Sequence, residues 1–443
     1  MNYDITIGGG GILGCSVAYW LSGMYKANIL VLEKNGEVGK EQSTRNTGTL
    51  HRPFYLDPQK RKKFAIAANW GFDLWGKIAH EDGLEWKQGG TLELAVRHDE
   101  IATLQEYQRW AHENGMDESE VRMYSDEEVA SLEPNITAAG ALLCKTDTSV
   151  NFGSFTQAMK KRAEKNGVNF KYESEIEGIN QGRHVTIYLK GREQIETGRF
   201  INTAGNFAVN LAHLCGEGMN YTDLNFRGDY WKVDPEFGKH FPWNVYTVPN
   251  HPKYQFLDPH LIVRSDGTFD IGPSALFVPT PQSYVDPGTF FQMFSLSNIG
   301  KYKRKMLEEP FTNKLKLFSS KEFLLLALGE LMHMTKDSMV RRMKSFIPTI
   351  TPNQIIGKGI SGIRSSVVNE RGEFEPEAIL LDNDLTFHVL AYNSPGASGA
   401  PGFAAYMVGE MQRAGLLDEL TVNKRKQLAD IEEIIASFRN LGL

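Results

Sequence analysis

Apolar and polar positions follow a distinct order at the start of the chain. Residues 3–8 (YDITIG) form a short apolar run, residues 12–25 carry small and apolar side chains at helical spacing, and residues 28–34 (NILVLEK) form a second apolar run. Short apolar runs bounded by glycine and polar residues are typical of strands buried inside a sheet. The pattern therefore predicts a strand, a helix and a second strand.

The same alternation of strands and helices returns near the C-terminus, whereas the middle of the chain is richer in strands and later in helices. This order predicts an α/β, Rossmann-like domain made of discontinuous segments with an inserted antiparallel-sheet domain, so that the whole chain is α+β. We expect the nucleotide-binding domain at 1–75, 140–215 and 345–443. The substrate-binding, or cap, domain is expected at 76–139 and 216–344.

Individual segments carry more detailed expectations. Residues 227–233 (RGDYWKV), 260–264 (HLIVR) and 268–272 (TFDIG) are expected to pair as an antiparallel sheet, followed by helical material. The apolar segment 318–334 is interpreted as a buried helix, with docking on a membrane surface as the alternative. Residues 423–441 are expected to form a closing amphipathic helix.

A glycine-rich turn joins the first predicted strand to the first predicted helix. Gly9, Gly11 and Gly14 fit the spacing G-x-G-x-x-G, in which the glycines permit a tight turn, close approach of a pyrophosphate and close helix packing. The helix N-terminus then offers N–H groups and a positive dipole end to phosphates. Glu33, at the end of the second strand, is expected to bind a ribose diol and disfavours a 2′-phosphate, so FAD or NAD is expected rather than NADP.

The next segment, 35–58, favours FAD over NAD. A nicotinamide dehydrogenase normally continues to a third strand, but this segment is a polar loop that contains glycine. Such loops fold over the ribityl and isoalloxazine parts of a flavin, and Gly48 allows close approach to the ring. The cofactor-binding residues expected at the end of the second strand and along this loop are Lys34, Ser43, Thr44, Arg45, Asn46, Thr47 and Gly48.

Four separated blocks carry a family resemblance: 45–58 (RNTGTLHRPFYLDP), 201–205 (INTAG), 359–372 (GISGIRSSVVNERG) and 393–407 (NSPGASGAPGFAAYM). In this order they resemble FAD-dependent oxidoreductases of the D-amino-acid-oxidase type, in particular the branch of L-2-hydroxyglutarate oxidase and malate:quinone oxidoreductase. The resemblance extends over nearly the whole chain. The further FAD-binding residues that it implies are Ala204, Gly205, Gly362, Pro395, Gly396, Ala397 and Ser398.

The resemblance also implies chemistry on a 2-hydroxy acid, which requires a hydride acceptor, a base for the hydroxyl proton and a cation for the carboxylate. His51, in the flavin-proximal block, and His260, at the start of a strand, are the candidate bases, with structural hydrogen bonding as the alternative. Arg364 and Arg264 are the candidate carboxylate clamps, because a guanidinium grips a carboxylate with two hydrogen bonds. A solvated strand arginine is the alternative for Arg264.

Two segments depart from the family pattern. Asn151 stands where relatives commonly carry an acidic residue, and Arg52 and Pro53 replace small residues after His51. Arg52 is a further candidate contact for a carboxylate or a phosphate. A phosphorylated substrate is therefore an alternative.

These observations predict an enzyme that oxidises an L-2-hydroxy acid, L-2-hydroxyglutarate or L-malate, to the 2-oxo acid with non-covalently bound FAD. Electrons are expected to pass to a quinone or another acceptor. Within enzymes, the alternatives are dehydrogenation of sn-glycerol-3-phosphate and amino-acid oxidation. A flavin-binding electron-transfer module without its own substrate is the alternative outside enzymes.

Composition and cysteine spacing limit the ligands and the cell compartments that we expect for this chain. The net charge of −6 argues against binding of nucleic acid, which depends on a surplus of lysine and arginine. Cys15, Cys144 and Cys215 lie far apart without metal-ligand spacing, so we expect no metal and a reducing compartment. We expect no signal peptide, and the sequence contains no uninterrupted apolar run of ~18 residues. We expect a cytoplasmic protein, either free or peripheral on the inner face of the cell membrane.

Overall fold

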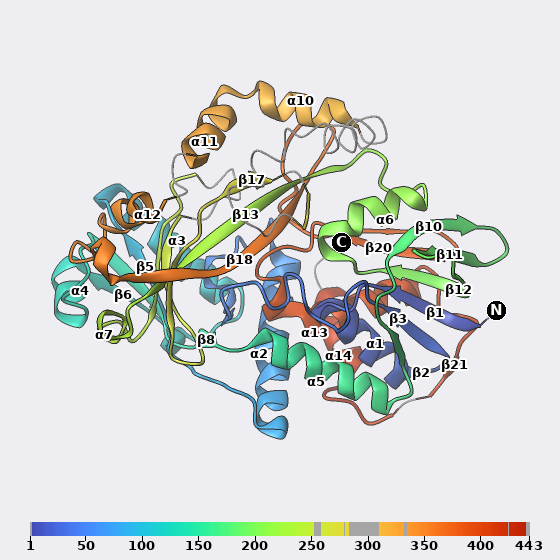
Figure 1. Cartoon of the computed structure of the whole chain (residues 1–443). Coiled ribbons are helices and arrows are strands. Elements are labelled where there is room, and N and C mark those ends of the chain that lie inside the picture. The colour runs from blue at the N-terminus through green and yellow to red at the C-terminus, as the bar shows by residue number, and fades with distance from the viewer. Residues whose placement is uncertain are drawn as a thin grey trace.

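Two β-sheets, each with its own helices, divide the molecule into two lobes (Figure 1). The first lobe contains the N-terminal strand, and the second contains the long strand β18. The computed structural model describes residues 2–251, 258–278, 280–282, 310–331, 335–423 and 425–439.

The first sheet is built mainly from parallel strands. Among the described residues it has the order β10-β11-β12-β1-β3-β9, with β20 beside β12 and β19 beside β20. β1 lies parallel to β12 and β3, whereas β10, β11 and β19 are antiparallel to their neighbours. Its strands are β1 (Tyr3–Gly8), β3 (Ile29–Leu32), β9 (Asn169–Lys171), β10 (Ile176–Gln181), β11 (Val185–Leu189), β12 (Gln194–Asn202), β19 (Ile379–Asp382) and β20 (Thr386–Leu390).

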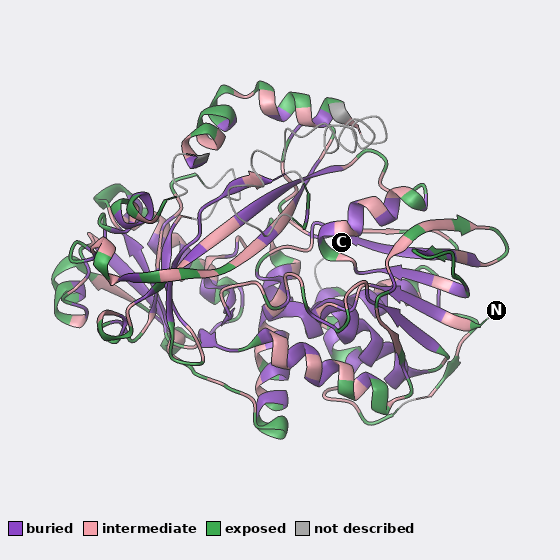
Figure 2. Ribbon diagram, viewed as in Figure 1, coloured by how far each residue is buried: buried purple, intermediate pink, exposed green. Residues whose placement is uncertain are grey.

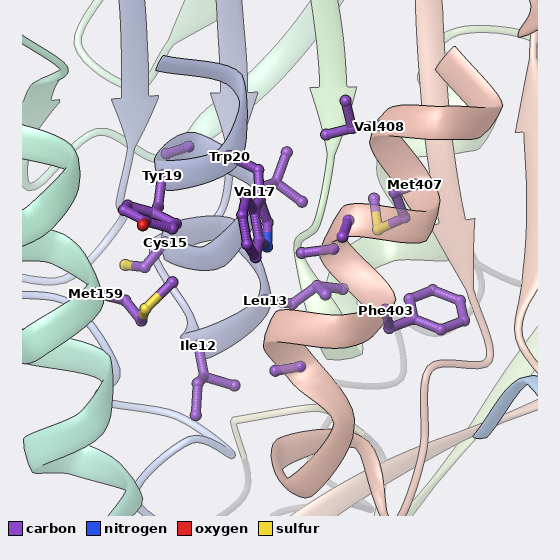
Figure 3. Close-up of a cluster of buried hydrophobic side chains, with 14 of the residues drawn as sticks. Ile12, Leu13, Cys15, Val17, Tyr19, Trp20, Met159, Phe403, Met407 and Val408 are labelled. Atoms are coloured by element: carbon purple, nitrogen blue, oxygen red, sulfur yellow. The ribbon is translucent and has the colours of Figure 1, made fainter. Parts of the chain in front are cut away.

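Helices cover both faces of this sheet. Alternate residues of β3 point to opposite cores: Ile29 and Val31 join the core of α1, whereas Leu30 and Leu32 join the core of α6. Figure 3 shows the first core, in which Trp20 lies against α13 (Gly396–Arg413) and donates its indole N–H to the Pro401 carbonyl at 2.8 Å. The helices are α1 (Ile12–Met24), α2 (Lys62–Asp82), α5 (Phe152–Lys165), α6 (Ala208–Leu214), α13 (Gly396–Arg413) and α14 (Ile431–Arg439).

The second sheet is almost entirely antiparallel. Within the described ranges its order is β17-β13-β16-β15-β14-β5-β7-β6, and β18 pairs with β13 along the opposite edge of that strand. The predicted pairing of 227–233, 268–272 and 260–264 is confirmed as β13-β16-β15. The strands are β5 (Thr91–Ala95), β6 (Val121–Ser125), β7 (Gly140–Cys144), β13 (Thr222–Val233), β14 (Asn244–Thr247), β15 (His260–Val263), β16 (Phe269–Gly272), β17 (Leu276–Val278) and β18 (Ile355–Val368).

Short elements complete the two lobes. The small pair of β4 and β8 positions the segment that follows residue 50, and β2 pairs with β21 near the C-terminus. Their bounds, with those of the second lobe's helices, are β2 (Tyr25–Lys26), β4 (Thr49–Leu50), β8 (Thr148–Ser149), β21 (Thr421–Val422), α3 (Ile101–Glu113), α4 (Asp126–Leu132), α7 (Pro235–Gly238), α10 (Phe311–Ser319), α11 (Lys321–Leu331) and α12 (Lys336–Met343).

The predicted fold class is confirmed, and three segments differ in detail. β7 and β18 pair within the second sheet, although 140–215 and 345–443 were expected in the nucleotide-binding domain. β7 pairs with β5, and β18 pairs with β13. Both strands therefore belong to the second sheet, although neighbouring parts of the sequence belong to the first lobe. The closing helix begins at Ile431, eight residues later than expected, and residues 424 and 440–443 lie outside the described residues.

The apolar segment 318–334 is not a buried helix along its described part. α11 exposes Leu324, Leu325 and Leu328, which are 44%, 59% and 51% exposed (Figure 2). Residues 299–309 and 332–334, where more helical material was expected, lie outside the described ranges. No helix in the described part of the chain combines the length and apolar character that crossing a membrane requires.

The turn between β1 and α1 generates a first prediction. A Cβ atom on Gly14 would lie 2.0 Å from the carbonyl oxygen of Gly9, so the Gly14→Ala substitution forces the turn and α1 apart. We expect the free energy of unfolding to fall by about 1–3 kcal/mol in a urea titration. Gly36→Ala is the matched control, because a Cβ there meets no atom within 4 Å. Equal stability of the two variants would contradict the prediction.

A buried carboxyl in the second sheet generates a second prediction. Burial, and then the charges of Asp147 and Asp258, raises the pKa of Glu93 to about 8. The unfolded chain therefore releases this proton near pH 4.5 while the folded chain keeps it, so stability is lost as the pH rises towards 8. Glu93→Gln should gain stability relative to the wild type by up to about 1.4 kcal/mol per pH unit across this window. Urea titrations at pH 5, 6.5 and 8 measure the difference, and a constant difference would contradict a raised pKa.

Candidate active site

A cavity of about 840 Å³ lies between the two sheets. One wall is formed by the loops that follow β1, β3, β12 and β20, at the carboxyl ends of the parallel strands, where α/β sheets bind ligands. The other wall comes from β13, β18 and the segment 273–275. The cavity thus lies between the loops of the first sheet and the strands of the second.

The glycine turn forms one end of the cavity. Gly9 has φ +109, and a Cβ there would lie 2.7 Å from the Thr203 carbonyl oxygen, so only glycine fits. Glu33 accepts a hydrogen bond from the Gly10 N–H at 2.9 Å and lines the cavity. α1 follows its N-cap residue Gly11, and the Ser43 hydroxyl accepts the Ile12 N–H at 2.9 Å. Bare main chain, a helix N-terminus and an acid in the cavity wall fit an adenine dinucleotide.

Most of the expected cofactor-binding residues are brought together by the structure. Those that line the cavity are Gly9, Gly11, Glu33, Lys34, Ser43, Arg45, Asn46, Thr47, Ala204, Gly205, Gly362, Pro395, Gly396, Ala397 and Ser398. Gly14, Thr44 and Gly48 do not line it. Gly14 lets α1 approach the turn, the Thr44 hydroxyl donates to the Gly39 carbonyl at 2.8 Å, and Gly48 has φ +72 beside Val150.

The turn 394–398 closes the opposite end of the cavity at the start of α13. Its N-cap residue, Pro395, makes no side-chain capping hydrogen bond, so the first N–H groups of α13 are available at a positive dipole end. The Ser398 hydroxyl accepts the backbone N–H of His51 at 2.9 Å. This contact places His51 beside the turn.

His51 is the histidine candidate that lines the cavity. Its Nδ1 lies 2.9 Å from Oδ2 of Asp147, which is fully buried and also accepts the Arg52 N–H at 2.7 Å and the Thr91 hydroxyl at 2.7 Å. Because Asp147 acts as an acceptor toward its neighbours, Nδ1 carries the proton. Nε2 of the neutral ring is then a hydrogen-bond acceptor, as a base requires.

His260 has different surroundings and does not line the cavity. It is 1% exposed, its ring stacks on Tyr246 with 4.2 Å between centroids, and its Nε2 lies 3.2 Å from the Tyr230 hydroxyl. Burial lowers the pKa of His260 to about 3, so the imidazole is neutral. The structure therefore places Tyr230, and not His260, in the cavity wall.

The two candidate arginines also differ in their position relative to the cavity. Arg364 lines the cavity, where burial, and then the charge of Arg61, lowers the pKa of its guanidinium to about 10. Arg264 does not line the cavity. It forms an ion pair with Asp270 at 2.8 Å and donates to the Asn46 carbonyl at 2.7 Å, so it ties β15 to β16 and to the loop.

The two departures from the family pattern have structural roles. Arg52 forms a two-point ion pair with Glu120, at 3.0 and 3.1 Å, and lies over the Phe72 ring. Asn151 caps α5, because its side-chain oxygen accepts the N–H groups of Gly153 and Ser154.

Sequence reasoning missed Asp147, Tyr230 and Tyr246 as site residues. One signal for Asp147 exists in the pairing of β4 with β8, in which Thr49 is opposite Ser149 and Leu50 opposite Thr148. The next pair in this antiparallel register is His51 and Asp147. The sequence segments themselves give no indication that these two strands pair.

Comparisons with known proteins agree with this geometry. A family model described as FAD dependent oxidoreductase (DAO) matches residues 4–410. The L-2-hydroxyglutarate dehydrogenase of Salmonella houtenae is 26% identical over 421 residues, covering 93% of each chain. The mitochondrial L-2-hydroxyglutarate dehydrogenase of Homo sapiens is 24% identical over 434 residues, covering 93% of this chain and 89% of that protein.

Solved structures share the fold. L-alpha-glycerophosphate oxidase from Mycoplasma pneumoniae with FAD bound has a TM-score of 0.68 at 20% identity, covering 96% of this chain and 97% of that chain. Glycine oxidase from Geobacillus kaustophilus has a TM-score of 0.66 at 16% identity, covering 93% and 94%. The predicted cofactor, FAD, and the predicted enzyme class are confirmed. The chain belongs to the DAO family of FAD-dependent oxidoreductases.

Proposed function

We propose that this enzyme oxidises L-2-hydroxyglutarate to 2-oxoglutarate. The observation that carries the proposal is that His51 and Arg364 line one cavity beside the turn 394–398. A base and a guanidinium are the two protein groups that oxidation of a 2-hydroxy acid requires. The L-2-hydroxyglutarate dehydrogenases that match most of this chain support the same substrate. L-malate, one methylene shorter, is the second compound of this class to test.

His51 accepts the hydroxyl proton at Nε2 in the proposed reaction. Asp147 holds the Nδ1 proton, fixes the ring orientation, and stabilises the imidazolium that forms. When bound, FAD supplies the acceptor for the hydride that leaves the substrate carbon. The fully buried Asp147 carboxylate thus acts on the substrate through His51.

Arg364 holds the carboxylate next to the reacting carbon. Burial and Arg61 disfavour the charged form of this guanidinium, and an anionic substrate compensates that charge. The first N–H groups of α13 add a positive potential at the same end of the cavity. This end therefore suits an anionic substrate.

We also propose a division between the lobes and a route for the electrons. The first sheet with its helices holds FAD non-covalently, and the second sheet covers the substrate. Electrons pass from FAD to a quinone in the membrane, with the protein resting on the inner face. α11 supports this location, because it exposes Leu324, Leu325 and Leu328 next to the exposed Lys321.

Anaerobic mixing with substrate tests the function. We expect L-2-hydroxyglutarate to bleach the flavin absorbance of the purified enzyme, and FAD to be released intact by heat. The panel includes L-malate, sn-glycerol-3-phosphate and L-amino acids at equal concentration. Addition of a soluble quinone or NAD to the bleached enzyme then identifies the acceptor. Failure of every 2-hydroxy acid to bleach the flavin would refute the proposal.

The His51→Gln variant is the control for the role of the base. It should retain FAD, because its main-chain contact with Ser398 is kept, but it should bleach about 10²–10⁴-fold more slowly with the same substrate. Bleaching at the wild-type rate would exclude His51 as the base and leave the substrate assignment intact.

Binding to vesicles tests the membrane contact. Co-sedimentation with vesicles that contain phosphatidylglycerol should weaken by about tenfold in the double variant Leu325→Ser, Leu328→Ser, because two exposed apolar contacts are lost. Ile356→Ser is the matched control, since Ile356 is 59% exposed but lies on β18. Equal losses in both variants, or no binding by the wild type, would contradict the contact.

A further inference from the structure

A side-chain amide joins the two lobes next to Arg364. Asn206, in the 3-10 turn Gly205–Phe207 between β12 and α6, is 3% exposed. Its Nδ2 donates to the Ile363 carbonyl at 3.0 Å, and its Oδ1 accepts the Ser365 N–H at 2.8 Å. One side chain of the first lobe therefore binds the main chain on both sides of Arg364 in β18.

Both main-chain groups lie on the edge of β18 that faces away from β13. Main-chain groups of successive residues in an antiparallel strand point alternately to its two edges. Ile363 and Ser365 are two positions apart, so both bond Asn206 on one edge. Arg364, between them, turns its N–H and carbonyl toward its partner Phe226 in β13. Within the described ranges β13 is the one strand that pairs with β18, and Asn206 takes the place of a second neighbouring strand.

The partners of the Asn206 amide fix its orientation. The Ser365 N–H only donates and the Ile363 carbonyl only accepts, so Oδ1 must face the first group and Nδ2 the second. Rotation by 180° would oppose like groups at both contacts, and buried polar groups without a partner are costly. Oδ1 also accepts an N–H of the Gln42 side chain, from the loop 35–58. The amide therefore holds β18, the turn after β12 and the loop in one arrangement.

A second contact in the same stretch holds β18 against the loop. A Cβ atom on Gly362 would lie 2.2 Å from the Arg45 carbonyl oxygen, so only a residue without a side chain fits here. Gly362, Arg45 and Arg364 line the cavity, whereas Asn206 does not. Any effect of Asn206 on a ligand in the cavity must therefore act through β18.

Arg364 is the residue of this stretch whose position matters for an anion. Burial, and then the charge of Arg61, lowers the pKa of Arg364 to about 10. Arg61 itself donates to the Ser394 carbonyl, so the guanidinium of Arg364 lies close to the end of the cavity where α13 begins. Fixed peptide groups on both sides of Arg364 fix the direction of its Cα–Cβ bond. The place that its guanidinium can reach depends on that direction.

We propose that Asn206 is a positioning residue, which holds the main chain around Arg364 so that the guanidinium meets the substrate carboxylate with two hydrogen bonds. This inference rests on the proposed oxidation of L-2-hydroxyglutarate. Two parallel hydrogen bonds between a guanidinium and a carboxylate tolerate little displacement. Loss of one of them corresponds to roughly a tenfold change in affinity. The carboxylate is present in substrate, transition state and product alike, so the loss appears in KM and not in kcat.

Steady-state kinetics of the Asn206→Leu holoenzyme test this inference, with calorimetric titration of 2-oxoglutarate as a separate measure of binding. Leucine is similar in size to asparagine but neither donates nor accepts. KM for L-2-hydroxyglutarate and Kd for 2-oxoglutarate should both rise by about tenfold, while kcat changes by less than about twofold. Asn206→Ser, whose hydroxyl can donate and accept, should give a smaller rise. Ser365→Ala is the matched control, because it loses the side-chain contact with Asp223 but keeps its main-chain contact with Asn206.

An Arg364→Gln background separates positioning from general support of the fold. Asn206→Leu should add less than about twofold to KM there, because the guanidinium that Asn206 positions is absent. Hydrogen exchange at the Ser365 amide should be faster in both position-206 variants, which reports on the contact without turnover. The serine variant takes the place of the leucine variant in this comparison if the latter does not fold.

Three results would count against the inference or its basis. An equal rise in KM with and without Arg364 would overturn it, because Asn206 would then act only on the fold. Unchanged binding of 2-oxoglutarate in Asn206→Leu, with the Ser365 amide exchanging faster, would overturn it as well. Lack of flavin bleaching by the wild type with any 2-hydroxy acid would instead refute the proposed function.

Discussion

The geometry of the candidate active site depends on one buried carboxylate. Asp147 is 0% exposed. A charge at such a depth is tolerated only where hydrogen bonds replace its hydration, and a mobile neighbour would leave it unpaired. The groups that donate to it are the His51 ring, the Arg52 N–H, the Thr91 hydroxyl and the Cys144 thiol. Asp147 therefore joins the loop after β4 to β5 and to the end of β7, and it orients His51 as a result.

The two lobes contribute different kinds of group to the cavity. The parallel sheet contributes the loops at the ends of its strands, among them the turn at Gly9 and the start of α13. The second sheet contributes side chains such as Tyr230 and Arg364 from β13 and β18. In the proposed division, the first lobe holds the cofactor that the whole family shares, whereas side chains of the second sheet can be exchanged without disturbing the sheet. The second sheet is therefore the part of the site in which substrate preference can change.

The sequence predicts the contacts that are local in the chain and misses those that depend on distant pairing. The turn from Gly9 to Gly14 and Glu33 belong to one strand–helix–strand unit, and the spacing alone defines it. Asp147 contacts His51 only because β8 pairs with β4. Tyr230 contacts His260 only because the residue between them in the sheet, Gly272, has no side chain. Neither contact follows from periodicity, because the first joins residues that are 96 positions apart and the second joins residues that are 30 positions apart.

The same limit explains why two histidines looked equivalent in the sequence. Nδ1 of His51 faces the carboxylate of Asp147 and the ring lines the cavity, whereas Nδ1 of His260 faces a neutral carbonyl and the ring lies beneath tyrosines. A carboxylate partner stabilises a positive imidazolium, but a carbonyl in an apolar setting leaves burial as the dominant effect. One imidazole is thus suited to receive a proton, and the other is suited only to hold the proton of a neighbour in place. The partner of the second ring nitrogen decides what each histidine can do.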